Sequence, residues 1–320
     1  MRLSRILALA LSWLCAATVA QAQVDKPVRL LVGFAPGGSA DIAARLLADR
    51  MKDDLKQSVV VENRPGAGGR IVAEAIRNAP ADGSTLMLTP IVVTVLAPMV
   101  FSKLPYDPLV DFTPIAHVAN FQFAMSVAAT HPAKNVQELV AWWKANPPMA
   151  NFGSPAPGSL PHFFGVMIER SAGINLVHVP YNGGGPLMNA VMGNQVSSGI
   201  DTLVDQIELH RTGRIRLIAT SGAQRSPLLP EVPTFGEGGL KDVEGTSWFA
   251  VYAPAKTPDA TVRQLNGAIN KALAVPELRE RFAKLGLEPT GGTPADLSAR
   301  MAQDTARWAP VVKASGFRAD

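Results

Sequence analysis

Four glycine-rich turns constrain the fold of this chain most strongly, because each separates a strand-like apolar run from a helix-like segment. The first run, Val28–Val32, continues into Phe34-Ala35-Pro36-Gly37-Gly38-Ser39-Ala40-Asp41 and then into an amphipathic helical pattern. Similar turns occupy residues 65–69, 153–159 and 181–186. Strands that alternate with helices in this way form a parallel sheet with helices on both faces. The chain is therefore predicted to be an α/β protein.

The alternation occurs twice, which predicts two domains joined by hinge strands. Strand-like runs lie at 28–32, 59–61, 85–88, 123–128, 151–152, 176–179, 197–200, 215–220 and 248–253. Three helices close the chain, and Thr257-Pro258 and Thr293-Pro294 are expected to start two of them, since a cap followed by proline suits a helix N-terminus. We assign 23–123 plus 246–320 to domain 1 and 124–245 to domain 2, so the chain crosses between the domains twice.

The first 22 residues are typical of a signal peptide. Arg2 and Arg5 precede a short apolar run, and Ala20-Gln21-Ala22 is a small-x-small cleavage site. The single cysteine, Cys15, lies within the apolar run. The mature chain would therefore start at Gln23, without cysteine, and would be stabilised by burial rather than by disulfides. We expect an exported protein.

Composition and motifs argue against several classes of function. The formal net charge of +4 falls to +2 once Arg2 and Arg5 are removed, and no basic cluster is interleaved with aromatic residues, so nucleic acid is not an expected partner. No later apolar run is long enough to span a membrane, since Pro90 and Pro98 interrupt residues 86–100. None of the glycine turns fits the Walker A or G-x-G-x-x-G pattern of nucleotide-binding proteins.

The glycine turns themselves form the expected ligand site. In open α/β sheets ligands bind beyond the carboxyl ends of the strands, and a helix N-terminus behind a turn attracts anions. The turn at 34–41 contains no Lys or Arg, so backbone N–H groups and a hydroxyl would hold the anion, with Asp41 as a helix cap. Phe34 and Tyr181 are expected to line the cleft, which favours an aromatic or apolar acid. A neutral cleft argues against several free charges on the ligand, unless water or helix termini satisfy them.

Two other kinds of chemistry fit the residues less well. Ser154 or Ser159 with His162, and Asp201 to orient the histidine, would give an exported hydrolase. However, no G-x-S-x-G elbow is present, and helix capping or ligand contact accounts for these residues. The five histidines show no metal-ligand spacing, so we expect neither a metal nor a cofactor.

Over nearly the whole mature chain, the sequence resembles the tripartite tricarboxylate transporter substrate-binding receptors, also called the Bug-type family. In the first half the resemblance rests on 34–41, on Glu62-Asn63-Arg64-Pro65-Gly66-Ala67-Gly68-Gly69 and on Asp82-Gly83-Ser84-Thr85-Leu86. In the second half it rests on Gly153-Ser154-Pro155 through Gly158-Ser159 to His162, on Val179-Pro180-Tyr181-Asn182-Gly183 and on Leu229-Pro230-Glu231-Val232-Pro233-Thr234. Ala156, Gly185 and Asn189 depart from residues that are frequent in the family.

The resemblance implies a periplasmic binding protein type II-like fold, with two α/β domains, a central cleft and two crossover hinge strands. The domains would close like a Venus flytrap on a small organic acid (a mono-, di- or aromatic carboxylate) and deliver it to membrane permease subunits. We expect a monomeric receptor and not an enzyme, and a sensor for a membrane histidine kinase stays an alternative. The residues expected to bind the ligand are Phe34, Pro36, Gly37, Gly38, Ser39, Asp41, Gly153, Ser154, Gly158, Ser159, His162, Tyr181, Asn182, Gly183, Gly184 and Asp201.

Overall fold

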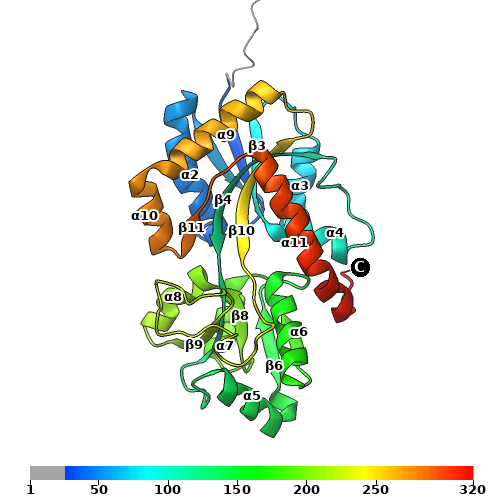
Figure 1. Ribbon diagram of the computed structural model, residues 1–320, viewed down its shortest axis with the longest axis vertical. Coiled ribbons are helices and arrows are strands. Elements are labelled where there is room, and N and C mark those ends of the chain that lie inside the picture. The colour runs from blue at the N-terminus through cyan, green and yellow to red at the C-terminus, as the bar shows by residue number, and fades with distance from the viewer. Residues whose placement is uncertain (1–25, 320) are drawn as a thin grey trace, which may run out of the picture.

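The computed structural model describes residues 26–319 and shows two lobes, one above the other in Figure 1. The first lobe is built on a six-stranded sheet with the order β11-β4-β10-β3-β1-β2, and the second lobe on a five-stranded sheet with the order β7-β6-β8-β5-β9. The predicted signal peptide, residues 1–22, lies outside the described residues. Within the described part of the chain, no helix has the length and apolar character needed to cross a bilayer.

The sheet of the first lobe is mixed rather than parallel throughout. β1 (Val28–Val32) pairs in parallel with β2 (Val59–Asn63) and β3 (Thr85–Pro90), which confirms the predicted βαβαβ order. β10 (Ser247–Pro254) runs antiparallel between β3 and β4 (Phe112–Phe121), a strand that the sequence did not predict. The short strand β11 (Leu287–Pro289) is antiparallel to β4 and forms the sheet edge.

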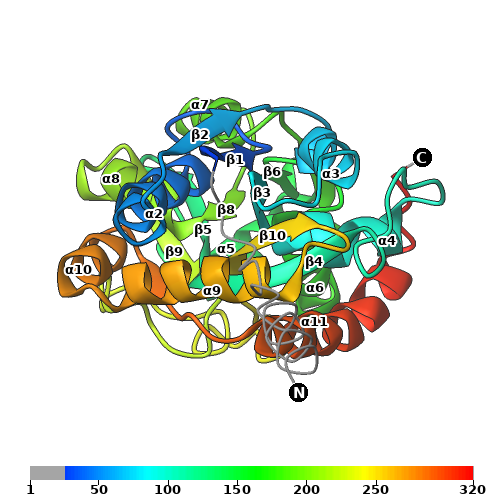
Figure 2. The same cartoon turned by 90° about the horizontal axis from the view of Figure 1, so that it is seen from above.

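Helices from both ends of the chain cover this first sheet. α2 and α9, for example, pack against each other although 200 residues separate them (Figure 2). Thr293 caps α11 through a capping box with Asp296, as predicted. Thr257 does not cap α9, which begins after Pro258, because its hydroxyl donates to Pro254 O instead. The helical elements of the first lobe are α2 (Ser39–Leu55), η1 (Ala67–Gly69), α3 (Arg70–Arg77), η2 (Val92–Leu96), α4 (Ala97–Val100), α9 (Asp259–Ala274), α10 (Pro276–Lys284) and α11 (Pro294–Ser315).

The second lobe repeats the strand–turn–helix pattern. β6 (Asn151–Ser154) pairs in parallel with β7 (Val177–Pro180) and β8 (Gly199–Thr202), while β5 (Phe123–Ala128) is antiparallel to β8 and to β9 (Ile215–Thr220). All four predicted glycine turns lie between a strand and a helix, after β1, β2, β6 and β7. The helical elements of the second lobe are α5 (Val136–Ala145), η3 (Pro147–Met149), α6 (Leu160–Ala172), α7 (Gly184–Met192) and α8 (Leu203–Arg211).

The chain crosses between the lobes twice, and Ser221 joins the two crossings. The first crossing is Gln122, between β4 and β5, and the second is the segment 221–246, between β9 and β10. The Ser221 hydroxyl accepts from Phe123 N–H at 3.0 Å and donates to Gly245 O at 2.7 Å. The proposed domain boundaries lie next to these crossings, and the division of the chain into those domains stays a proposal.

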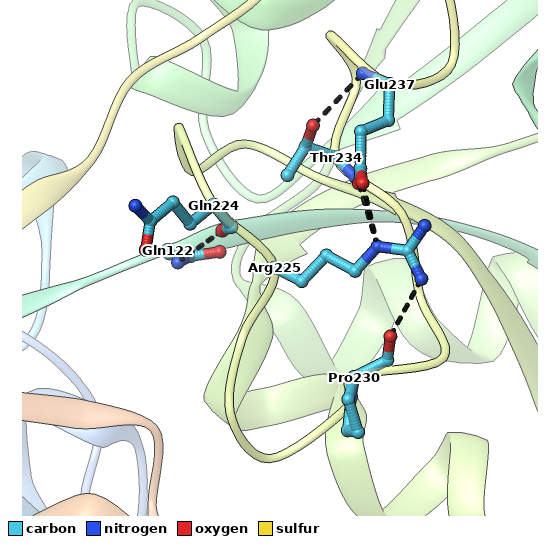
Figure 3. A network of polar contacts seen from close by, with 6 residues as sticks. All are labelled: Gln122, Gln224, Arg225, Pro230, Thr234 and Glu237. Carbon is cyan, nitrogen blue, oxygen red and sulfur yellow. Dashed lines mark hydrogen bonds and ion pairs between the residues drawn. The ribbon is translucent and has the colours of Figure 1, made fainter.

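The second crossing is folded tightly onto itself (Figure 3). The Arg225 guanidinium binds the Glu237 carboxylate at 2.9 Å and also donates to Pro230 O at 2.8 Å. Thr234 and Glu237 exchange hydrogen bonds between backbone and side chain, and Gln122 donates to Gln224 O at 3.3 Å. This segment therefore carries its own polar network and is held to the first crossing.

The last helix, α11, packs against both lobes. It lies on β4 of the first lobe and also contacts α6 of the second. Trp308 on α11 is buried with its ring 5.7 Å from the Phe164 ring of α6. One helix turn earlier, Asp304 accepts a hydrogen bond of 2.7 Å from the Trp248 indole on β10. A single hydrophobic cluster consequently includes side chains from both sheets.

Candidate functional site

A cavity of about 720 Å³ lies where the glycine turns of the two lobes meet. Residues 34–40 line it from the first lobe, and residues 155–156 and 159–161 of the turn at 155–161, together with the turn at 182–186, line it from the second. We call these three turns the clamp. Each leads into the N-terminus of a helix, namely α2, α6 or α7. The predicted site residues that line the cavity are Phe34, Pro36, Gly37, Gly38, Ser39, Ser159, Asn182, Gly183, Gly184 and Asp201.

Asp41 holds the first turn of the clamp in place through hydrogen bonds and is not part of the cavity lining. Its carboxylate accepts from Gly37 N–H at 2.9 Å and from Arg45 at 3.0 Å. Although burial alone would raise the pKa of the Asp41 carboxyl, these hydrogen bonds hold it below its usual range. Gly37 lines the cavity, but its N–H, which was expected among the donors for the ligand, is bonded to the Asp41 carboxylate in this structure. Gly38 N–H and Ser39 N–H remain at the start of α2.

Ser154, Gly158 and His162 support the second turn of the clamp and do not line the cavity. Ser154 is fully buried, donates to Ala156 O at 3.1 Å and lies 2.7 Å from His178 Nε2. Gly158 N–H donates to His162 Nδ1 at 3.1 Å. Ser159 lines the cavity, but its hydroxyl donates back to Ala156 O at 2.6 Å and does not cap α6.

The histidines beneath this turn are neutral. The rings of His162 and His178 stack with centroids 4.0 Å apart, although the two residues are distant in sequence. Burial lowers the pKa of His162 to about 3 and that of His178 to about 4. The serine paired with a histidine is thus Ser154, which is sealed away from the cavity, and the partner is not His162. This geometry gives no support to the hydrolase alternative.

Tyr181 and Gly153 serve packing around the third turn. Neither belongs to the cavity lining. A Cβ atom on Gly153 would come within 2.4 Å of the Leu187 side chain and 3.0 Å of the Tyr181 ring, so glycine is needed for close packing. Phe34 and Tyr181 are the two aromatic residues expected in the cleft. Phe34 lines the cavity and Tyr181 does not.

Asp201 is a buried carboxyl in the cavity wall. Its Oδ1 accepts from Thr202 N–H at 2.8 Å, and its Oδ2 has no hydrogen-bond partner among the described residues. That oxygen lies beside Gly184, where an added Cβ would approach it to 2.4 Å. Burial, followed by the negative charge of Asp205, raises the pKa of the Asp201 carboxyl well above its usual range. The neutral form is thereby favoured, and it offers one hydrogen-bond donor beside the clamp.

Sequence reasoning missed two other groups of lining residues. One group lies at the chain crossings and consists of Phe121, Phe123, Ser247 and Phe249. The other group comes from α7, α8 and the segment after α8, and consists of Met188, Asn189, Met192, Asp205, Leu209 and Arg214. These residues lack a glycine signal, and their spacing along α7 and α8 resembles that of any helix face. The cleft is not neutral throughout, since the cationic Arg214 lines the cavity from the second lobe. Ala156, Gly185 and Asn189, the departures from the family pattern, lie in the lining as well.

The site offers no recognisable metal centre. Among residues 26–319, no three His, Cys, Asp or Glu side chains gather in a way that could hold a metal ion. The cavity instead combines helix N-termini, apolar walls and a few polar groups, which is the usual composition of a small-molecule site.

Comparison with known proteins identifies the family. The model of the tripartite tricarboxylate transporter family receptor matches residues 43–317. The Rhodopseudomonas palustris protein Rpa4515, solved with adipate, is 32% identical and superposes with a TM-score of 0.87 over 92% of this chain and 98% of that one. MatC from the same organism, solved with bound malate, is 29% identical with a TM-score of 0.83 over 90% of this chain and 99% of that one.

A third solved structure is the periplasmic binding protein BugD. It is 32% identical, with a TM-score of 0.83 over 92% of this chain and 99% of that one. These matches confirm the predicted two-lobed binding-protein fold. The family and these structural neighbours are binding receptors rather than enzymes.

Proposed function

This chain belongs to the tripartite tricarboxylate transporter receptor family, and we propose that it captures a small organic carboxylate in the clamp and delivers it to membrane permease subunits. The observation that carries the proposal is the meeting of three helix N-termini, those of α2, α6 and α7, at one cavity. The first N–H groups of a helix lack partners within it and carry partial positive charge, so they suit a carboxylate.

The charge of the clamp supports a carboxylate held mainly by backbone groups. No charged side chain of the first lobe, within the part of the chain that the structure describes, lines the cavity. The donors there are Gly38 N–H and Ser39 N–H, with Ser159 and Asn182 facing them from the second lobe. The structural relatives solved with adipate and malate show that this fold accommodates small organic acids.

Closure of the lobes is the proposed means of retaining the ligand. A carboxylate that contacts α2 on one side and α6 or α7 on the other has more contacts when the lobes approach each other. The ligand then stabilises the closed state by its differential affinity for that state. The two crossings, which Ser221 joins, are the proposed hinge.

The binding claim is tested by thermal shift and calorimetry with mono-, di- and tricarboxylates. An acid at one hundred times its Kd should stabilise the protein by about 2.7 kcal/mol. A Gly38→Phe variant should lose this response, because the phenyl ring would fill the clamp. The substitution itself is tolerated, since position 38 has an ordinary extended backbone and an added Cβ would lie 3.6 Å from Ala35 O.

The matched control is Gly267→Phe, on α9 and with no atom within 4 Å of an added Cβ, which should keep the response. The binding proposal is wrong if protein that has been unfolded, dialysed and refolded binds no organic acid. Delivery is tested separately, since deletion of the gene should abolish cellular uptake of the bound acid. Unchanged uptake in the deletion strain would contradict transport and favour a sensor.

A further inference from the structure

The cavity does not end at the clamp but continues along a groove between α7 and α8. Met188, Asn189 and Met192 line it from α7, and Asp205 and Leu209 line it from α8. Met188 and Met192 are four positions apart, as are Asp205 and Leu209, so each pair lies on one face of its helix. We call this extension the α7–α8 groove.

The connectivity of the second sheet places the two helices on the same face. The connections β7–α7–β8 and β8–α8–β9 both join parallel strands and both advance across the sheet in the same direction. Right-handed crossovers therefore place α7 and α8 on one face, with their N-termini at the clamp and their C-termini at the far edge.

The groove leads away from the clamp to Arg214. Asp201 is level with Ala124 of β5, whereas Ile215, the residue after Arg214, is level with Ala128 near the other end of that strand. Along α7, the eight steps from Gly184 to Met192 rise by about 12 Å. Because this rise separates the two ends of the groove, an elongated acid suits it better than a short one such as malate.

The groove has an apolar middle and a cationic far end. Met188 is buried, and Met192 and Leu209 are half-buried and contribute to the same hydrophobic cluster. Arg214 is exposed, is the one cationic side chain lining the cavity among the described residues, and makes no side-chain hydrogen bond or ion pair with any of them. Asp205, whose carboxylate accepts a 2.6 Å hydrogen bond from the Thr202 hydroxyl, lies at the clamp end.

We propose that the α7–α8 groove is a second subsite, which takes the hydrocarbon chain of an elongated acid and binds a second carboxylate at Arg214. This inference rests on the proposed function, because the first carboxylate stays in the clamp. The ligand class is a medium-chain α,ω-dicarboxylate. The apolar middle of the groove offers no partner for a charged group, so the second carboxylate is accommodated only beyond it, where an arginine can bind it through two donors.

The test is calorimetry with dicarboxylates of increasing length, namely succinate, adipate, suberate and sebacate, beside octanoate as a monocarboxylate. In the wild-type protein the longer dicarboxylates should bind more tightly than succinate and than octanoate. Arg214→Gln should weaken suberate or sebacate binding by about tenfold, the effect of losing a charged hydrogen bond, and should leave succinate unchanged.

Arg211→Gln is the matched control, because Arg211 is exposed on α8, pairs with Glu208 and does not line the cavity. It should leave every affinity unchanged, and melting temperatures verify that both variants fold. The groove assignment is overturned if Arg214→Gln binds the long dicarboxylates as the wild type does, or if affinity does not depend on length. Binding of short acids alone would leave the proposed function intact, whereas binding of no acid at all would contradict both.

Discussion

Asp41 illustrates how the clamp depends on side chains that lie outside the cavity lining. It was expected as a helix cap, yet Gly38 occupies the N-cap position without a side-chain cap. The Asp41 carboxylate instead fixes Gly37 N–H at 2.9 Å, and Asn63 donates to Phe34 O at 3.1 Å from the neighbouring strand end. The shape of the first turn is therefore fixed by hydrogen bonds to the side chains of Asp41 and Asn63, neither of which lines the cavity.

Replacement of Asp41 should damage both stability and binding. Asp41→Ala leaves Gly37 N–H without its partner, so the free energy of unfolding should fall by about 1–3 kcal/mol, and the affinity for the acid should fall as well. Urea unfolding and calorimetry measure the two effects. Asp49→Ala is the control, since Asp49 is exposed on the same helix and pairs only with Lys52. Equal effects of the two substitutions would contradict the bracing role.

The stacked histidines predict how stability depends on pH. Burial lowers the pKa of His162 from 6.5 to about 3, and that of His178 from 6.5 to about 4. At a pH between 6.5, the pKa in the unfolded chain, and these lowered values, the unfolded chain binds more protons than the folded chain. The free energy of unfolding should therefore decrease as the pH falls below about 6.5.

His178→Gln keeps a polar partner near Ser154 and should flatten part of this decrease between pH 6.5 and 4. Unfolding by urea at several pH values measures the slope. His210→Gln is the control, because His210 is half-buried on α8 and distant from the stacked pair in sequence. If the His178 variant and the wild type lose stability in parallel as the pH falls, the buried pair is not the cause.

At the scale of elements, the βα units were predicted well from the sequence, because a glycine-rich turn separates each strand from the helix that follows it. The turns after β1, β2, β6 and β7 are located by their glycines and by the apolar runs before them. β4 was missed since Pro114, His117 and Asn120 interrupt its apolar run, although the strand is largely buried. α8 was missed because its buried face includes the polar Gln206, whose amide is satisfied by backbone carbonyls of Ala124 and Asp201.

The same limitation explains which parts of the site were predicted. The clamp could be found because backbone N–H donors need glycine and helix starts, which are visible in sequence. The walls could not be found, since Met192 and Leu209 are ordinary helical residues until the tertiary structure places α7 beside α8. The hydrogen bond from Gly37 N–H to the Asp41 carboxylate was not predicted, because no sequence pattern reveals that this carboxylate reaches back four residues.

α11 offers a test of how strongly the C-terminal helix joins the two lobes. Trp308 fills the space against Phe164 and Gly245, so Trp308→Ala should lower the free energy of unfolding by about 3–5 kcal/mol. Urea unfolding checks the value. Lys313→Ala, on an exposed position of the same helix, should change it by less than about 0.5 kcal/mol. A small effect at Trp308 would mean that α11 is dispensable for the packing of α6.

At the scale of the whole molecule, the two lobes and their two crossings give a receptor whose site is complete only when both lobes contribute. The first lobe supplies uncharged backbone donors, and the second supplies donors together with Asp201, Asp205 and Arg214. Under the proposed function, a carboxylate in the clamp would be recognised by both lobes, and the remainder of the ligand would be recognised by the second lobe alone.

The most direct test of this account is mass spectrometry of the small molecules released on denaturing protein that was purified without a refolding step. Wild-type protein should release an organic acid, near one equivalent if the sites are filled. Gly38→Phe, purified in parallel, should release little or none, while Gly267→Phe should match the wild type. Release of no acid from wild-type protein that also binds none after refolding, or equal release from the Gly38 variant, would contradict carboxylate capture in the clamp.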